Sequence, residues 1–308
     1  MDISIIASTL RLSTPLTFGA LGGLFSERSG IVNIALEGMM LFGAVSAGVI
    51  SYYTGNPWIG LAGGALSGMV LAAVHGVICI TFEGDQIISG MALNIFALGI
   101  PPVLCNGLFG TPSSTPAIEE TVPIIAPEFL KAVPVIGQLV SQVSVLVWVG
   151  FIAAACAFTV FKKTRFGLRL HVSGENPAML DAAGVSVTYY RYAGLLICGI
   201  LAGTGGAYLS IAHGNQFIRN MSAGRGFIAL AALILGNWKP GRVLLACLFF
   251  GFMDALQIRL QDIGIIPVEI VQILPYIVTM IMLIGIISKP TPPSGLGIPY
   301  RMQKDRYS

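Results

Sequence analysis

Three polar side chains interrupt segments that are otherwise apolar. Asn33 and Glu37 lie in the stretch 29–38, and Asn94 lies in a later apolar stretch. Amide and carboxylate groups are costly to place in lipid, so we expect them to face other helices or a wet path. The spacing of four residues predicts that Asn33 and Glu37 share one helix face. Two interpretations stay open: hydrogen bonds that fix helix packing, or a lining that contacts a polar solute.

A second pattern lies in the polar stretch that follows residue 161. Asn176 is suited to cap a helix, Pro177 suits its first position, and Gly184 suits the turn that ends it. A helix of about two turns is too short to be stable alone in water, so it must dock on its own chain or on a cytoplasmic partner. The residues assigned to this docking element are Gly174, Glu175, Asn176, Pro177, Ala182, Ala183 and Gly184.

The sequence contains no recognisable catalytic or metal-binding motif. The histidines His75, His171 and His213 lie in separate regions, and we expect His75 to be a packed, hydrogen-bonded residue. There is no Gly-Lys dipeptide, hence no P-loop, so any ATP that drives this protein must be hydrolysed by another chain. The cysteines show no Cys-x-x-Cys spacing, which predicts neither a disulfide framework nor a metal site.

The elements that position these residues are predicted from composition and hydropathy. Of 308 residues, 55% are hydrophobic and 10% are charged, and the mean hydropathy is +0.83. A soluble domain carries roughly 25% charged residues, so lipid must cover much of this surface. The net charge of +3 is too small to suggest nucleic acid as a partner.

The sequence predicts an all-α polytopic membrane protein with about nine spanning helices, in a range of eight to ten. The expected spans are 4–25, 31–53, 58–82, 87–109, 142–161, 191–212, 227–238, 241–260 and 268–288. The seventh is short and is expected to be a half-helix. Pro101 and Pro102 are expected to end or kink the fourth. The stretches 19–43 and 203–226 resemble each other loosely, which suggests an internal repeat.

Lys and Arg predict the orientation of the chain, because they are enriched in cytoplasmic loops. With 162–190 in the cytoplasm, most basic residues fall on that side: Arg28, Lys162, Lys163, Arg165, Arg169, Arg191, Lys239, Arg242, Lys289, Arg301, Lys304 and Arg306, against Lys131, Arg219, Arg225 and Arg259 outside. The N-terminus is then outside and the C-terminus cytoplasmic. We expect one membrane domain over 1–288, an extracytoplasmic loop at 110–141, and a loose cytoplasmic tail at 289–308.

Small residues predict how two of the spans pack. In the third span a small residue recurs every fourth position, at Gly60, Gly64, Gly68, Ala72 and Gly76. The sixth span shows the same spacing at Gly199, Gly203 and Ala207. Small residues at this spacing let helix backbones approach closely in lipid. We expect tight packing; a sliding surface is the alternative.

Four motifs carry a resemblance to a known family. Residues 165–185 hold Arg-x-Gly followed by GENPAMLDAAGV, residues 22–40 read GGLFSERSGIVNIALEGMM, residues 85–94 read DQIISGMALN, and residues 224–232 read GRGFIALAA. In order and over most of the chain, they resemble permeases of bacterial ABC importers in the branched-chain amino acid, ribose and nucleoside class, and the nucleoside and simple-sugar subgroup in particular.

The resemblance implies a complex in the bacterial inner membrane. ATP-binding subunits would hold ATP and Mg²⁺, this chain would hold no cofactor, and a sister permease, expected to be a different chain, would share the pathway. An extracytoplasmic binding protein would deliver a nucleoside or simple sugar. By position, the segment 174–184 would couple this chain to the ATP-binding subunit, and Asn33, Glu37 and Asn94 would line the pathway. The alternatives are an ion-coupled secondary transporter of a small polar solute and a membrane-embedded enzyme.

Overall fold

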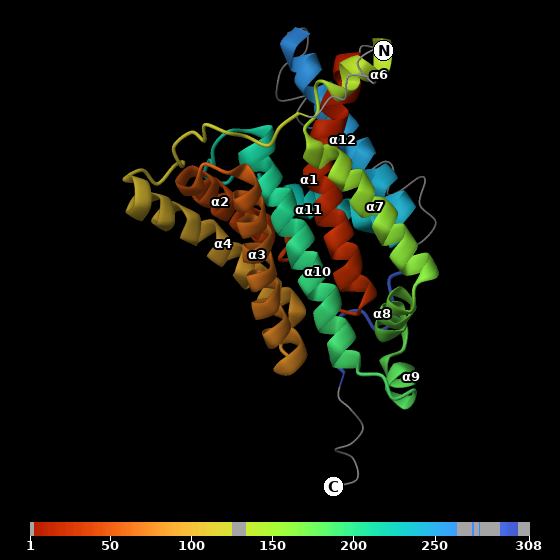
Figure 1. Cartoon of the computed structure of the whole chain (residues 1–308). Helices are drawn as coiled ribbons and strands as arrows, with labels where there is room; N and C mark the ends of the chain where they lie inside the picture. The colour runs from red at the N-terminus through yellow and green to blue at the C-terminus, as the bar shows by residue number, and fades with distance from the viewer. Residues whose placement is uncertain (1–2, 125–133, 264–272, 274–276, 278–289, 301–308) are drawn as a thin grey trace.

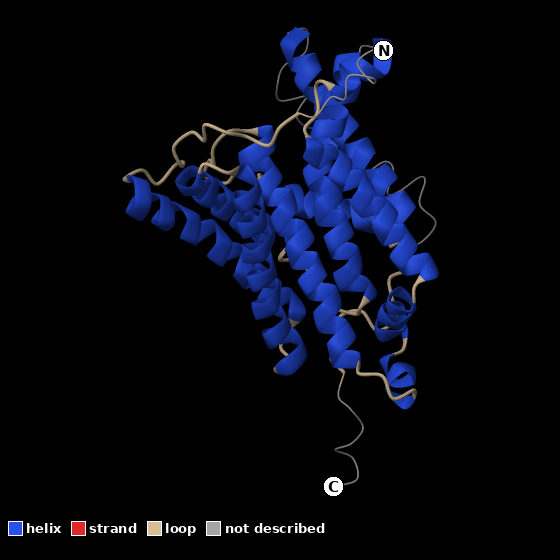
Figure 2. Ribbon diagram, viewed as in Figure 1, coloured by secondary structure: helices blue, strands red, loops and turns tan. Residues whose placement is uncertain are grey.

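The computed structural model describes residues 3–124, 134–263, 273, 277 and 290–300. Over these residues the regular secondary structure is entirely helical, with one isolated bridge between Ser114 and Ile218 (Figure 2). The elements are α1 (Ile3–Arg28), α2 (Leu36–Thr54), α3 (Pro57–Gly76) with a π-helical end η1 (Val77–Thr81), α4 (Gln86–Phe109), α6 (Pro134–Val140), α7 (Val145–Lys163), α8 (Arg165–Glu175), α9 (Pro177–Ala182), α10 (Val187–Tyr208) with a π-helical end η2 (Leu209–His213), α11 (Arg225–Leu235) and α12 (Pro240–Ile263).

The helices α1 and α10 form the centre of the bundle (Figure 1). On one side α10 packs on α3 and α2, and α4 lies outside them. On the other side α1 packs on α12, α11 and α7. The short helices α8 and α9 lie at one end of the bundle, below α7, and the first residues of α1 lie at the opposite end. This arrangement is typical of a polytopic membrane protein.

Six helices among the described residues are long and apolar enough to cross a membrane: α2, α3 with η1, α4, α7, α10 with η2, and α12. They confirm six of the nine predicted spans as long apolar helices. The first predicted span is also a helix, α1, but it falls below the hydropathy of the other six. Its neighbours bury it along most of its length, so few of its side chains would face lipid.

The remaining predicted spans have different outcomes. The seventh is the short helix α11, 11 residues long, as expected for a half-helix. The ninth, 268–288, lies outside the described residues apart from two isolated positions, so the total of nine stays a prediction. The pair Pro101 and Pro102 does not end α4, which continues to Phe109.

Three sequence-based expectations are wrong in detail. The second span does not begin at residue 31, because α2 begins at Leu36 and residues 31–35 are not helical. The loop 162–190 contains a further helix, α8, that was not predicted. The tail is not loose over its whole length, because residues 290–300 are held against α8, α10 and the turn before α2 by hydrogen bonds.

The predicted close packing of small residues is confirmed at the crossing of α3 and α10. A Cβ atom added to Gly68 would lie 2.7 Å from the Cα atom of Gly203, and the Cβ atom of a residue replacing Gly199 would lie 2.5 Å from the carbonyl oxygen of Gly68. Backbone meets backbone here with no side chain between, which is the geometry that glycine permits.

Candidate functional site: a broken segment in the bundle and two short helices at its end

The chain between α1 and α2 does not form a helix, and its residues 31–35 are called the broken segment. It turns at Ser29 and Gly30, where Gly30 has φ +99°, and then runs through 31–35. Its backbone groups are bound by side chains of other elements: Gln86 Oε1 accepts from the Val32 amide at 2.7 Å, and His75 Nε2 lies 3.1 Å from the Val32 carbonyl oxygen. Non-helical backbone inside a membrane protein needs such partners.

His75 therefore has the structural role that the sequence predicted. It is fully buried, its Nδ1 atom lies 2.9 Å from Ser89 Oγ, and its other ring nitrogen contacts Val32. It joins α3, the start of α4 and the broken segment.

Asn33 lies before α2, so the prediction that it shares a helix face with Glu37 is wrong. Its Oδ1 atom accepts from the Ala35 amide at 3.1 Å, and its Nδ2 atom contacts Cys198 Sγ of α10 at 3.1 Å. An asparagine that binds backbone two residues on competes with helix formation, which explains why the helix begins later.

Glu37 joins the start of α2 to the start of α11. Its Oε1 atom accepts from Ser222 Oγ at 2.6 Å and from the Gly224 amide at 2.8 Å, and its Oε2 atom accepts from the Gly226 amide at 2.6 Å. The first amides of a helix have no partners within that helix and carry its positive end, so a carboxylate satisfies both needs. Gly224, at φ +83°, gives the turn that points these amides at Glu37.

Asn94 of α4 performs the corresponding task for α2. Its Oδ1 atom accepts from the Gly38 amide at 2.8 Å, and its Nδ2 atom donates to the Ile34 carbonyl at 2.9 Å. The structure thus gathers all three predicted residues around the beginning of α2, with Asn33 0%, Glu37 4% and Asn94 7% exposed. Each is bonded within its own chain, which supports the packing interpretation that the sequence left open.

The short helix predicted from capping residues is present as α9. Asn176 Oδ1 accepts from the Met179 amide at 3.1 Å, Pro177 takes the first position, and Gly184, at φ +73°, follows the C-terminal turn. Of its apolar side chains Leu180 is buried, whereas Met179 is 66% exposed. The six-residue helix α9 thus exposes the apolar side chain of Met179 on the outside of the bundle.

The end of α8 connects α9 to the broken segment. Ser173 Oγ donates to the Ser29 carbonyl at 3.1 Å, and a Cβ atom added to Gly30 would lie 3.3 Å from the Cα atom of Gly174. Ser173 and Gly174 are both buried. A displacement of α9 would therefore reach the turn at Ser29 and Gly30 through one helical turn of α8.

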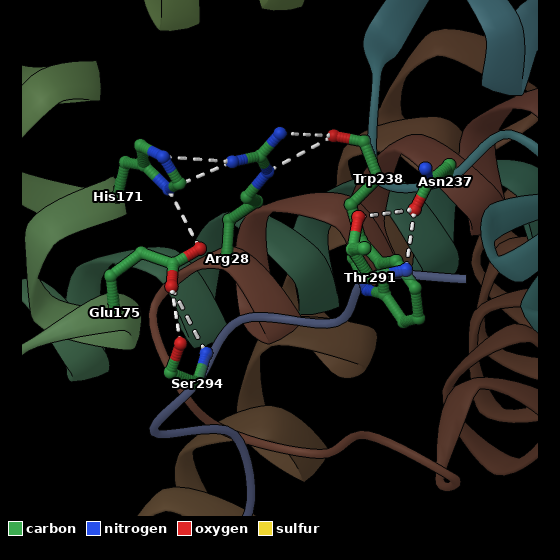
Figure 3. A network of polar contacts seen from close by, with 7 residues as sticks. All are labelled: Arg28, His171, Glu175, Asn237, Trp238, Thr291 and Ser294. Atoms are coloured by element: carbon green, nitrogen blue, oxygen red, sulfur yellow. Dashed lines mark hydrogen bonds and ion pairs between the residues drawn. The ribbon is translucent and has the colours of Figure 1, made fainter. Parts of the chain in front are cut away.

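A polar network surrounds the same place (Figure 3). Arg28 donates to the Trp238 carbonyl through Nε at 3.0 Å and Nη2 at 2.7 Å, and its Nη1 atom lies 2.8 Å from His171 Nδ1. His171 Nδ1 is also 4.0 Å from Glu175 Oε1. The network ties the end of α1 to α8 and to the turn after α11.

The charges in this network shift two ionisation equilibria. Partial burial lowers the pKa of His171 below its usual 6.5, and the Arg28 charge lowers this pKa further, against a smaller opposing effect of Glu175. Partial burial alone would raise the pKa of Glu175. The hydrogen bonds from Ser294 and the nearby His171 and Arg28 outweigh that effect and hold the pKa below 4.5.

Several residues of the site were not singled out from the sequence. The partners of Glu37, namely Ser222 and the two amides at 224 and 226, lie nearly two hundred residues away in the chain. The run Gly-Arg-Gly at 224–226 was the available signal, since it combines a flexible turn with a helix start. Nothing local marks Trp238 as a partner, because its contact uses a backbone carbonyl.

Within the described residues no group of three or more His, Cys, Asp or Glu side chains is arranged to hold a metal ion. The described residues form a helical bundle with six helices that could cross a membrane, which defines the class as a polytopic membrane protein.

The chain belongs to the family described as the permease component of the branched-chain amino acid transport system, whose profile matches residues 5–285. It is 37% identical to the nucleoside ABC transporter permease protein NupC of Lactococcus lactis, over 97% of each chain. It is 36% identical to the guanosine ABC transporter permease protein NupQ of Bacillus subtilis, over 96% of each chain. It is also 34% identical to the putative glucose ABC transporter permease protein TsgC13 of Haloferax volcanii, over 85% of this chain and 79% of the relative.

No solved structure matches the chain. Membership of the family confirms the predicted class: this is a multi-pass permease subunit of an ABC importer, and the hydrolysis of ATP takes place in separate subunits. Such a permease works with ATP-binding subunits and a substrate-binding protein.

Proposed function

We propose that the importer to which this chain belongs carries nucleosides, with simple sugars as the second candidate. The observation that supports this most strongly is the similarity over 97% of the chain to a permease named for nucleoside transport. The relative named for glucose transport supports the second candidate.

The polar groups of the bundle suit a neutral substrate. Both carboxylate oxygens of Glu37, at the start of α2, already accept hydrogen bonds from Ser222 and from amides at the start of α11, which makes this residue a poor site for a coupling ion. A nucleoside or sugar is polar and neutral, and a few amides and hydroxyls suffice to pass it. Weak binding in the permease is favourable, because a tight site would trap the substrate while a binding protein can supply affinity.

We propose that the segment 174–184 couples the permease to the ATP-binding subunit. ATP binding would draw the partner subunits together and move α9, and α8 would pass the movement through Ser173 to the turn at Ser29. That turn leads into residues 31–35, which are bound to α3, α4 and α10. A shift there would alter the starts of α2 and α11 together, since Glu37 links them.

The pathway itself is proposed to lie along the interface with a sister permease, expected to be a different chain. On this view Asn33, Glu37 and Asn94 shape the broken segment beside the pathway. Whether any of them also contacts the substrate stays a prediction, to be tested by separating uptake from assembly. The proposed orientation places the start of α1 outside the cell and α8, α9 and residues 290–300 in the cytoplasm.

The substrate is tested by uptake in cells that carry the complete importer. Uptake of a radiolabelled nucleoside should be competed by other nucleosides and lost when the ATP-binding partner is deleted. Competition by glucose or a pentose, with no effect of nucleosides, would replace the first candidate with the second. Uptake that persists without any ATP-binding chain would support the ion-coupled alternative.

The coupling role is tested by Met179→Asp, with Met179→Leu as the matched control. A charge on the exposed side of α9 should raise the ATP hydrolysed per nucleoside transported, or release the ATP-binding subunit on co-purification, whereas the leucine variant should behave as the parent. Normal uptake and normal co-purification of Met179→Asp would contradict the coupling assignment.

A further inference from the structure

Residues 290–300, which include a turn at 294–297, form a strap across the polar end of the bundle. Their composition, rich in proline and glycine, gave no reason to expect a fixed path. Nevertheless Pro293 and Gly295 are buried, and Leu296 packs against the apolar cluster that includes Leu180 of α9. The strap therefore has both polar and apolar anchors.

The strap forms hydrogen bonds with the proposed coupling segment 174–184 at two places. On the N-terminal side, the Ser294 amide and Oγ donate to Glu175 Oε2 at 3.1 and 2.9 Å, and the Gly295 amide donates to the Gly174 carbonyl at 2.7 Å. On the C-terminal side, Tyr300 Oη donates to Asp181 Oδ2 at 3.0 Å. The first attachment precedes α9, and the second is made to Asp181 in the last turn of α9.

The same strap is fastened to three other parts of the bundle. The Gly297 amide donates to the Gly30 carbonyl at 3.1 Å, at the turn that leads into the broken segment. Arg191 of α10 donates through Nη1 to the Ile298 carbonyl at 3.0 Å. At the other end, the Thr291 amide and Oγ1 donate to Asn237 Oδ1 at 2.9 and 3.1 Å, after α11 (Figure 3).

We propose that residues 290–300 position α9 and make it move as one unit with the turn at Gly30, with Ser294 and Tyr300 as the positioning residues. The proposal rests on the coupling function proposed above for α9. Six residues do not make a stable helix in water, and Leu180 is the buried side chain that α9 itself supplies. The strap adds hydrogen bonds that hold α9 in place. The bond from Gly297 to Gly30 connects the same strap to the turn before the broken segment.

The experiment measures the mobility of α9 in the assembled importer. A spin label is attached at Met179→Cys in a chain that also carries Cys156→Ser, since the other four cysteines are buried. The strap is altered by Tyr300→Phe, which removes the bond to Asp181, and by Ser294→Ala. Tyr189→Phe is the matched control, because Tyr189 lies nearby at the start of α10 and is 62% exposed.

Tyr300→Phe is expected to raise the ratio of mobile to docked label by about two- to tenfold, the usual net effect of one hydrogen bond. Ser294→Ala should give a smaller rise, since the Ser294 amide still binds Glu175. Combining Tyr300→Phe with Asp181→Ala should add little to either single change, because both remove the same bond. Tyr189→Phe should leave the label unchanged.

A label that stays equally immobile in Tyr300→Phe and Ser294→Ala would overturn the positioning role. So would strictly additive effects of Tyr300→Phe and Asp181→Ala. The ATP hydrolysed per nucleoside, measured on unlabelled Tyr300→Phe beside Met179→Asp, separates this proposal from the coupling function. If Met179→Asp uncouples transport but Tyr300→Phe changes neither mobility nor stoichiometry, the coupling function stands and the strap proposal fails. If mobility rises in Tyr300→Phe while Met179→Asp transports normally, the strap positions α9 and the coupling function fails.

Discussion

Glu37 joins the start of its own helix, α2, to the start of α11. It belongs to α2, and it accepts three hydrogen bonds at the start of α11. A carboxylate can accept from several donors at once, whereas an amide side chain presents one oxygen and one donor group. The chemistry of this position therefore requires an acid and not merely a polar residue.

Glu37→Gln is expected to destabilise the chain by about 1–3 kcal/mol, because one backbone amide at 224 or 226 would lose its acceptor in a buried place. Thermal unfolding in detergent measures this as a lower midpoint, with Glu120→Gln in an exposed loop as the control. If the midpoint is unchanged while uptake is lost, the residue acts in the pathway and not in packing.

His171 gives the polar network around Arg28 a dependence on pH. Its pKa is lowered in the folded state, so the unfolded chain binds the proton more readily. The contribution to stability is complete above pH 6.5 and is lost progressively as the pH falls below 6.5 towards the lowered value. Glu175, whose pKa is also lowered, adds a loss only below pH 4.5.

The unfolding midpoints of the parent and of His171→Gln, compared between pH 5 and 8, are expected to show a steeper acid decline in the parent. Subtracting the two curves removes the contribution of the other histidines. Parallel curves over the whole range would mean that protonation of His171 does not affect folding.

At the scale of elements, two helices of the bundle, α2 and α11, each begin after a non-helical segment. The non-helical segment 29–35 precedes α2, and the segment 214–224, which lacks regular helix, precedes α11. The stretches 19–43 and 203–226 each include such a segment and the start of the helix after it, and an internal repeat stays a prediction. The helix α2 packs on both α3 and α10, and these two helices are in close backbone contact where they cross.

Gly203→Ala is expected to destabilise the bundle by about 1–3 kcal/mol, because its Cβ atom would lie 3.1 Å from the Cα atom of Gly68 and still closer to the carbonyl of Gly64. Gly99→Ala in α4 is the matched control, since an added Cβ atom meets nothing within 4 Å there. That control should be neutral or stabilising by about 0.4–1 kcal/mol. Equal midpoints for the two variants would argue against close backbone contact at the crossing.

At the scale of the whole molecule, the two ends of the bundle differ in kind. One end carries the turn between α2 and α3, and the other carries α8, α9 and the strap (Figure 1). The basic residues Lys162, Lys163, Arg165 and Arg169 lie at the second end, at the junction of α7 and α8. Because cytoplasmic loops are enriched in Lys and Arg, these residues support the proposed orientation, with this end in the cytoplasm.

A membrane-impermeant maleimide is expected to label Thr54→Cys on intact cells, and Ala183→Cys only after the membrane is permeabilised. Both positions are exposed, and both chains carry Cys156→Ser. Labelling in the reverse order would invert the proposed orientation and would place α9 where no ATP-binding subunit can reach it.

Much of the architecture follows from the sequence alone, for local reasons. Hydropathy over about twenty residues locates a span, because each helix must cover the bilayer by itself. Asn176, Pro177 and Gly184 locate α9, because capping depends on neighbours in the chain. Glycine spacing predicts that α3 packs closely, and four motifs suffice to indicate the permease family.

The tertiary structure decided what depends on residues far apart in the chain. Asn33 and Glu37 have helical spacing, yet Asn33 lies before α2. The bond from the Ala35 amide to Asn33 competes with a helix locally, and bonds from Gln86, His75 and Asn94 hold residues 31–35 in this path. Residues 290–300 of the tail have no helical or strand pattern in their sequence, and their path is set by bonds to Glu175, Gly174, Gly30 and Asp181. A local pattern cannot encode such contacts, since their partners come together only when the bundle has folded.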